Sequence, residues 1–171
     1  MSKIGLVLMV IFFVSGCSTS TITVTENHLP KVYKDHNETH EIKRKIKISL
    51  FRLNNYTDTP KAGLRAANIL EGVLRSKGYI VKTHIKKKYP TIKQARKQAK
   101  KDKSHFFMYG GVSEWRYKTG IDGEPAVSVQ LSLYKTKNGK LKWSASGSDS
   151  DWGNGSIGTT AQDLFEDMLR Q

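Results

Sequence analysis

Residues 126–147, AVSVQLSLYKTKNGKLKWSASG, decide the fold. Apolar and polar residues alternate from Ala126 to Tyr134, which is the two-residue period of a strand with one buried face. The residues expected to face inward are Val127, Val129, Leu131 and Leu133, and those expected to face outward are Ser128, Gln130 and Ser132. Asn138-Gly139 then supplies the strongest short hairpin signal. The stretch therefore predicts two adjacent antiparallel strands.

Upstream of this hairpin the pattern predicts three further strands, at residues 45–53, 79–85 and 104–117. The strand at 104–117 contains Gly110 and Gly111, and glycine inside a strand indicates a bend or a close approach of another backbone. It is expected to join the hairpin strands in an antiparallel meander.

Three helices are predicted from their caps and apolar stripes. The first follows Thr59 as N-cap, with Pro60 at the first helical position, and ends at Gly78. The second opens with a Thr91/Gln94 capping box. Its inward residues are expected to be Ile92, Ala95 and Ala99. The third covers residues 158–171, after a cap at Ser156.

The predicted order is β-α-β-α-β-β-β-α, in a single α+β (mixed α/β) domain. Two crossover units require parallel or mixed pairing, and the last three strands form the meander. One mixed sheet with helices packed on it satisfies both requirements.

The N-terminus carries a processing signal. Residues 4–14 are apolar without a break and follow Lys3, but the run is shorter than the ~20 residues needed to span a bilayer. It ends in Val14-Ser15-Gly16-Cys17, the bacterial lipobox pattern, in which the thiol accepts a diacylglycerol and cleavage makes Cys17 the new N-terminus. The alternatives are a plain signal peptide with a chance Gly-Cys, or a buried free thiol.

The lipobox predicts three segments: a signal peptide over 1–16 that is removed, lipidated Cys17 with a flexible tether over 17–44, and a globular domain over 45–171. Ser18 at the second mature position favours the outer membrane under the sorting rule of enteric-type bacteria. We therefore expect a chain anchored by lipid at the periplasmic face of the outer membrane. No cysteine remains for an intramolecular disulfide.

Charge is concentrated in one half of the chain. Residues 43–103 hold 19 Lys and Arg against three acidic residues, whereas 104–171 hold seven basic and eight acidic residues. The periplasmic address excludes nucleic acid, the commonest partner of basic proteins. The remaining partners are anionic polymer, lipid headgroups or an acidic protein, and the alternative is a merely solvated helix face. The cations expected to form this surface are Lys86, Lys87, Lys88, Lys93, Arg96, Lys97, Lys100 and Lys101.

No catalytic, metal or cofactor motif stands out, so we expect a protein that is not an enzyme. Residues 153–156, Gly-Asn-Gly-Ser, are better explained as a loop with a helix cap than as an anion site. Acidic residues near loops form no regular ligand set, and they are Asp122, Glu124, Asp149 and Asp151. His105 has no evident triad partner.

Aromatic residues gather in the second half of the chain. Trp115, Tyr117 and Trp152 are candidates for stacking on glycan rings or for a membrane interface. Cross-strand packing is the alternative, and it is favoured for Trp143. For Trp115 and Trp152 both interpretations stay open.

These features together resemble the small periplasmic lipoproteins of the CsgG-like (curli-channel) superfamily, which includes polysaccharide-export and penicillin-binding-protein-activating lipoproteins and domains like the N-terminal domain of TolB. The resemblance covers roughly residues 45–171. It is carried by Phe51–Asn55 with Thr57, Gly110-Gly111-Val112, the strand 127–134 and the hairpin KNGKLKWSASG. The chain has no room for the long membrane-inserting strands of the curli channel.

The resemblance implies an accessory lipoprotein: a non-catalytic scaffold or assembly component for export of polysaccharide or fibre, which forms a homo-oligomeric ring. One alternative is a monomeric binding module that activates a periplasmic cell-wall synthase. A second is an enzyme that acts on an envelope glycan through acids near Asp149 and Asp151.

Overall fold

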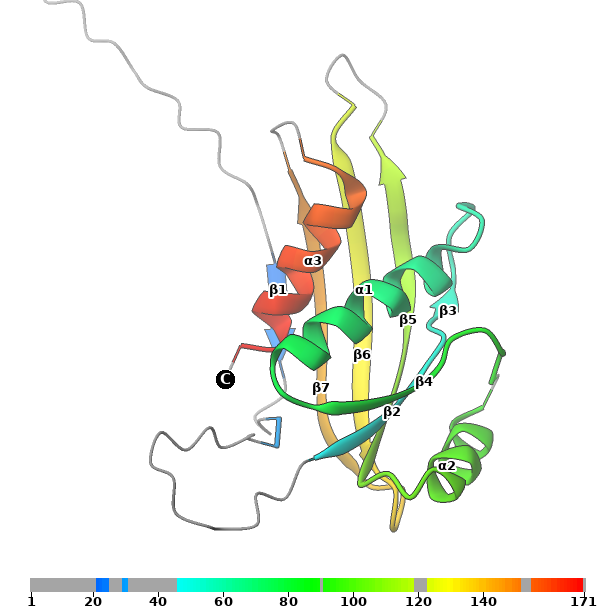
Figure 1. The fold of residues 1–171 in the computed structure, drawn as a ribbon. Coiled ribbons are helices and arrows are strands. Elements are labelled where there is room, and N and C mark those ends of the chain that lie inside the picture. Colours follow the sequence, from blue (N-terminus) through cyan, green and yellow to red (C-terminus); the bar gives the residue numbers. More distant parts are fainter. Residues whose placement is uncertain are drawn as a thin grey trace, which may run out of the picture.

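The computed structural model describes residues 21–24, 29–30, 46–89, 91–118, 123–151 and 155–170. These form one seven-stranded mixed sheet with three helices, which confirms the predicted α+β class (Figure 1). The strands are β1 (Thr21–Val24), β2 (Lys47–Phe51), β3 (Asn54–Asn55), β4 (Ile80–His84), β5 (Phe106–Tyr117), β6 (Pro125–Lys135) and β7 (Leu141–Ser150). The helices are α1 (Ala62–Ser76), α2 (Ile92–Lys101) and α3 (Ile157–Met168).

The sheet order is β1-β7-β6-β5-β2-β4, and β3 pairs with β5 beside β2. β2 lies parallel to both β4 and β5, as two crossover units require. β5, β6 and β7 form the predicted antiparallel meander. The predicted element order is therefore confirmed, with β1 and β3 as additions.

β1 is a difference from the tether predicted over residues 17–44. Thr21 to Val24 pair antiparallel with Ser148 to Ala145 of β7, so this part of the segment belongs to the sheet. Ile22 packs against the main core, and the hydroxyl of Tyr79 donates to the carbonyl of Pro30 at 2.8 Å. A four-residue strand among serines and threonines is too short to stand out from its periodicity.

The main core lies between one face of the sheet and helices α1 and α3, which lie side by side in front of the strands in Figure 1. The inward residues of β6 are buried as predicted, and its outward serines and Gln130 are not. α1 and α3 contribute the buried residues Ala62, Ala66, Leu70, Val73, Leu74, Ala161, Leu164, Phe165 and Met168. This confirms the apolar stripes of both helices.

The predicted cap of α1 is wrong. The residue before the helix is Lys61, at φ 63°, and it makes no side-chain cap. The Thr59 hydroxyl instead donates to the carbonyl of Trp115 on β5, which ties the loop to the sheet. The caps at Thr91 and Ser156 are confirmed, because each side chain accepts a hydrogen bond from the backbone N–H three residues on.

Among the described residues, α2 covers part of the opposite face of the sheet, at the end near the β6–β7 turn (Figure 1). Ala95 and Ala99 pack there against Phe51 and Phe107. Ile92 was expected to be inward, but it is 40% exposed because it lies at the first position of the helix, beyond the small cluster that the alanines cover.

Gly110 bears out the predicted close backbone approach. A Cβ at this position would lie 2.1 Å from the backbone oxygen of Gln130 on β6. The ladder between β5 and β6 then shifts register between Val112 and Glu114, which is a bulge.

Candidate functional site

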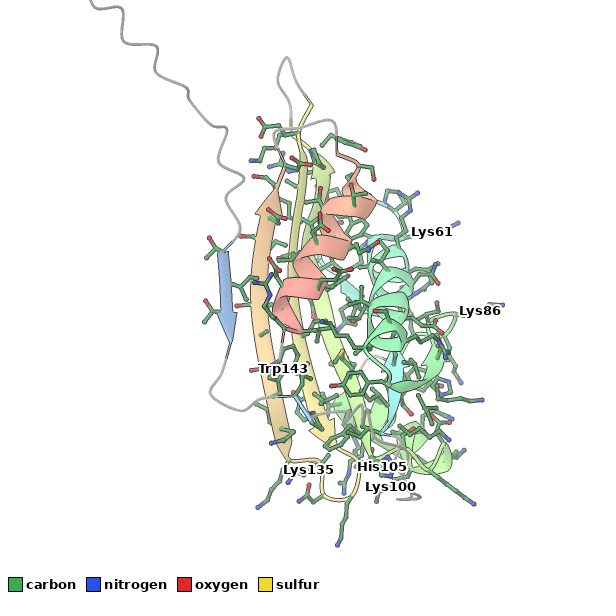
Figure 2. All side chains as sticks on the ribbon, turned by 60° about the vertical axis from the view of Figure 1, so that its left-hand side comes forward. Lys61, Lys86, Lys100, His105, Lys135 and Trp143 are labelled. Carbon is green, nitrogen blue, oxygen red and sulfur yellow. The ribbon has the colours of Figure 1, made fainter. Side chains whose placement is uncertain are left out.

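The candidate site is a basic surface built by the β4–α2 loop and the exposed face of α2. Because Ala95 and Ala99 are one helical turn apart, the alanine side of α2 packs on the sheet and the lysines point to solvent. We call this set the α2 basic surface: Lys86, Lys87, Lys88, Lys93, Lys97, Lys100 and Lys101, all exposed. Figure 2 shows Lys86 projecting from the side of the molecule away from β1, and Lys100 at the lower end.

Two adjoining hollows run over this surface. One, of about 680 Å³, lies between α2 and the β6–β7 turn and includes Lys93, Lys97 and Lys100 in its lining. The other, of about 370 Å³, lies between α2 and the preceding loop. Gln94 and Lys97 line both hollows, and neither lining contains a carboxylate. Clustered cations without neutralising acids raise the local concentration of anions, so the surface suits an extended anionic ligand.

Arg96 lines the 680 Å³ hollow beside the lysines, as predicted, but its guanidinium also hydrogen-bonds to the backbone of the β6–β7 turn. Its Nε donates to the carbonyl of Thr136 at 3.0 Å and its Nη2 donates to the carbonyl of Lys137 at 2.5 Å. The guanidinium therefore fastens α2 to the β6–β7 turn. The sequence shows that Arg96 is cationic. It does not show which backbone carbonyls accept hydrogen bonds from its guanidinium.

A polar cluster lies beneath α2, and the sequence did not predict it. Asp102 at the end of the helix accepts hydrogen bonds from Ser49 Oγ at 2.6 Å and from Gln98 Nε2 at 3.1 Å, and its Oδ2 lies 2.6 Å from His84 Nε2. Ser49 is fully buried, and the side chain of Asp102 is only 5% exposed. The one sequence signal is a serine inside the apolar strand KISLF.

This cluster is structural in its geometry. In a hydrolytic triad the imidazole lies between serine and carboxylate, so that it can take the proton of the hydroxyl. Here the carboxylate lies between Ser49 and His84, and both bind to it. The His84 ring stacks on Phe51 with centroids 5.3 Å apart, so the cluster joins β2, β4 and α2.

Asp102 makes stability depend on pH. Burial raises the pKa of the Asp102 carboxyl, but hydrogen bonds from Ser49, His84 and Gln98 and the charge of His84 outweigh burial and leave that pKa below its ordinary value. Because its pKa is lower in the folded state, the Asp102 carboxylate stabilises the fold above the unfolded-state pKa of about 4. This stabilisation is lost as the pH falls through the folded-state pKa.

We therefore expect Asp102→Asn to lower the free energy of unfolding by ~1–3 kcal/mol at neutral pH, because charge-assisted hydrogen bonds are lost. The gap in unfolding free energy should narrow as the pH falls below about 4 and through the lowered folded-state pKa, where the wild-type carboxyl becomes protonated. Urea unfolding across pH measures both. Asp163→Asn, at an exposed position of α3, is the control and should stay within ~0.5 kcal/mol. A gap that stays constant from pH 7 to pH 2.5 would contradict this assignment.

Solved structures similar to this chain identify its family. Two PelC dodecamers from Paraburkholderia phytofirmans are each 30% identical in sequence, with a TM-score of 0.71. The matches cover 88% of this chain and 96% or 95% of the PelC chains. This chain belongs to the PelC family.

Lipoprotein GNA1162 from Neisseria meningitidis shares the fold of this PelC-family chain, at 20% identity and a TM-score of 0.51. That match covers 65% of this chain and 86% of the other. No protein-family model matches the sequence, and no curated protein matches it.

The aromatic residues predicted to bind glycan rings or a membrane interface have different outcomes in this PelC-family structure. Trp115 is 3% exposed and lies in the main core, so its role as a surface aromatic is wrong: the bulge in β5 places it on the inward side, opposite Val127. Tyr117 at the end of β5 is 52% exposed, as a surface role requires. Trp152 lies outside the described residues. The packing role favoured for Trp143 is confirmed at 2% exposure.

In the described part of the PelC-family fold, the acidic residues considered as catalytic acids or calcium ligands do not come together in one site. Glu124 pairs with Lys118 at 3.5 Å, Asp149 lies within β7 opposite Val127, and Asp151 follows that strand. His105 Nδ1 accepts a hydrogen bond from the backbone N–H of Lys47 at 3.0 Å. Asp122 lies outside the described ranges.

The described ranges contain neither a cluster of metal ligands nor a membrane-spanning helix. No three His, Cys, Asp or Glu side chains come together there as metal ligands. Among the helices that the structure describes, none has the length and apolar character needed to cross a bilayer. Cys17, the predicted lipidation site, and the segment 1–16 lie outside the described residues.

Proposed function

We propose that this protein is a non-catalytic lipoprotein of the cell envelope that assembles as a ring and uses its α2 basic surface to bind an anionic polymer during export. The observation that carries the proposal is the PelC relationship, because proteins 30% identical over nearly their whole length are dodecamers. The lipobox at Cys17 supports an anchor in the outer membrane, facing the periplasm.

The position of β1 favours a polymer over lipid headgroups as the partner of the α2 basic surface. Thr21 pairs with Ser148, and the three residues between Cys17 and Thr21 allow the anchor to lie at most ~14 Å from Thr21. From Ser148 to Leu141, β7 runs ~23 Å toward the turn on which Arg96 of α2 is fastened, which is longer than this maximum reach. The surface therefore lies farther from the anchor than the linker can reach.

The ring is tested by the mass of the full chain, expressed with its signal and purified in detergent. Light scattering after size exclusion should give a multiple of the protomer mass at micromolar concentration. A monomer at all concentrations would contradict the ring and would favour the binding-module alternative. Cys17→Ser should lose membrane association in cell fractionation, since the acyl chains supply the anchor.

Polymer binding is tested separately with polygalacturonate as an anionic probe and dextran as a neutral one. The triple variant Lys93→Gln, Lys97→Gln, Lys100→Gln removes the three lysines of the 680 Å³ hollow and leaves Arg96, which fastens α2 to the β6–β7 turn. It should weaken polygalacturonate binding at least tenfold and reduce its salt dependence. The matched control, Arg65→Gln, Arg116→Gln, Lys118→Gln, removes three exposed cations outside the surface and should bind like wild type. An equal loss of polygalacturonate affinity in both triple variants would show that binding depends only on the net charge of the protein.

A further inference from the structure

A third hollow, of about 330 Å³, adjoins the α2 basic surface at Lys88, where the end of β2 meets the start of α1 and the β4–α2 loop. Three cations from three separate segments line it: Arg52, Lys61 and Lys88. Lys61 and the loop residue Lys86 lie on the same side of the molecule in Figure 2. Leu64 and Tyr89 supply apolar surface to the same lining.

The fold fixes the backbone position at or beside each of these three residues. Arg52 directly follows β2, whose residue Phe51 is fully buried. Lys61 occupies the left-handed region at φ 63°, and its carbonyl accepts hydrogen bonds from Leu64 and Arg65 at 3.0 Å each. Lys88 precedes Tyr89, whose ring meets Phe51 edge-on with centroids 4.7 Å apart. Packing in the neighbouring elements therefore brings these three residues to the lining of one hollow.

The positive charge of this hollow is not neutralised within the described chain. Its lining contains no carboxylate, and neither Lys61 nor Lys88 forms an ion pair with a described residue. The buried Nε of Arg52 has no hydrogen-bond partner among the described residues. A buried N–H without an acceptor is unfavourable, and a ligand oxygen would satisfy it. The first turn of α1 adds no acidic residue to offset these charges.

We propose that this hollow binds a small acidic sugar, with its carboxylate on Arg52, Lys61 and Lys88. A guanidinium beside ammonium groups is the arrangement that recognises a carboxylate most strongly. The volume lies at the lower end of the range for small-molecule sites and exceeds what a bare inorganic anion would fill. The ring of Tyr89 and the side chain of Leu64 provide apolar contact for the face of a sugar ring.

The site is distinct from the 680 Å³ hollow that the polymer-binding variants alter. It shares Lys88 and Tyr89 with the 370 Å³ hollow but none of the lysines of the 680 Å³ hollow. The inference does not require a ring or polymer export. Its failure would therefore leave the proposed function intact, and the reverse also holds.

Calorimetric titration of the full chain in detergent with glucuronate, glucose and inorganic phosphate tests the assignment. We expect one saturable glucuronate site per protomer and no heat with glucose. Lys61→Gln and Lys88→Gln, both at exposed positions that leave the core intact, should each weaken glucuronate binding about tenfold. Arg52→Gln should weaken it further, with its melting temperature measured alongside. Lys100→Gln, outside this hollow, is the matched control and should bind glucuronate within twofold of wild type.

Three results would overturn the proposal: no saturable binding of glucuronate, glucuronate binding that is unchanged in the Lys61→Gln and Lys88→Gln variants, or an equal loss in Lys100→Gln. Binding of inorganic phosphate without binding of glucuronate would also overturn it, because the ligand would then be a simple anion.

Discussion

Gly63→Ala is expected to destabilise the protein by about 3 kcal/mol or more, which corresponds to a fall in melting temperature of roughly 10 °C. A Cβ at Gly63 would lie 2.0 Å from the backbone oxygen of Leu53 and 2.9 Å from its carbonyl carbon. Both neighbours are backbone atoms, so no side chain can rotate away. The first turn of α1 would have to move off the segment between β2 and β3.

Gly72→Ala on the same helix is the matched control, because outside its chain neighbours and the backbone of its own helix no described atom lies within 4 Å of the added Cβ. Glycine in an exposed helix interior is unfavourable, so this variant should gain ~1 kcal/mol. Thermal unfolding of both variants should therefore give shifts of opposite sign. Similar shifts for the two glycines would contradict the close contact between α1 and Leu53.

Trp143→Ala is expected to cost ~3–5 kcal/mol in the free energy of unfolding. Trp143 on β7 is 2% exposed and lies opposite Leu133, which is fully buried. Truncation removes the largest of the fully buried side chains and leaves a cavity in the main core. Urea unfolding of the full chain, followed by circular dichroism, measures the loss.

Leu141→Ala controls for the strand itself, since Leu141 begins β7 and is 48% exposed. It should change the free energy of unfolding by no more than ~0.5 kcal/mol. If Trp143→Ala changed the free energy of unfolding as little as Leu141→Ala, Trp143 would not be a central packing residue.

Local sequence signals predicted the parts of this fold that depend on short-range pattern. The alternation through β6, the Asn138-Gly139 turn and the caps at Thr91 and Ser156 are all present. Each depends on residues within a few positions of one another. The same reasoning placed lysines on the exposed face of α2.

Contacts between distant segments lay beyond that reasoning. Thr59 has a cap signature, but its hydroxyl is 56 positions from the carbonyl of Trp115 that it meets. Arg96 is 40 positions from Thr136. Ser49, His84 and Asp102 come together only because parallel pairing of β2 with β4 brings Ser49 and His84 beside the end of α2. None of these partners can be read from spacing.

If Cys17 carries the proposed lipid anchor, the pairing of β1 with β7 limits how freely the domain can rotate relative to the membrane. A flexible tether of 28 residues, from 17 to 44, would allow the domain to drift ~30 Å from its lipid and to adopt any orientation. With Thr21 hydrogen-bonded into the sheet, only three residues separate it from Cys17. A three-residue linker restricts the tilt of the domain as well as its distance from the lipid. Neighbouring copies would then stand in a common orientation before they touch, which lowers the rotational entropy that their association must overcome.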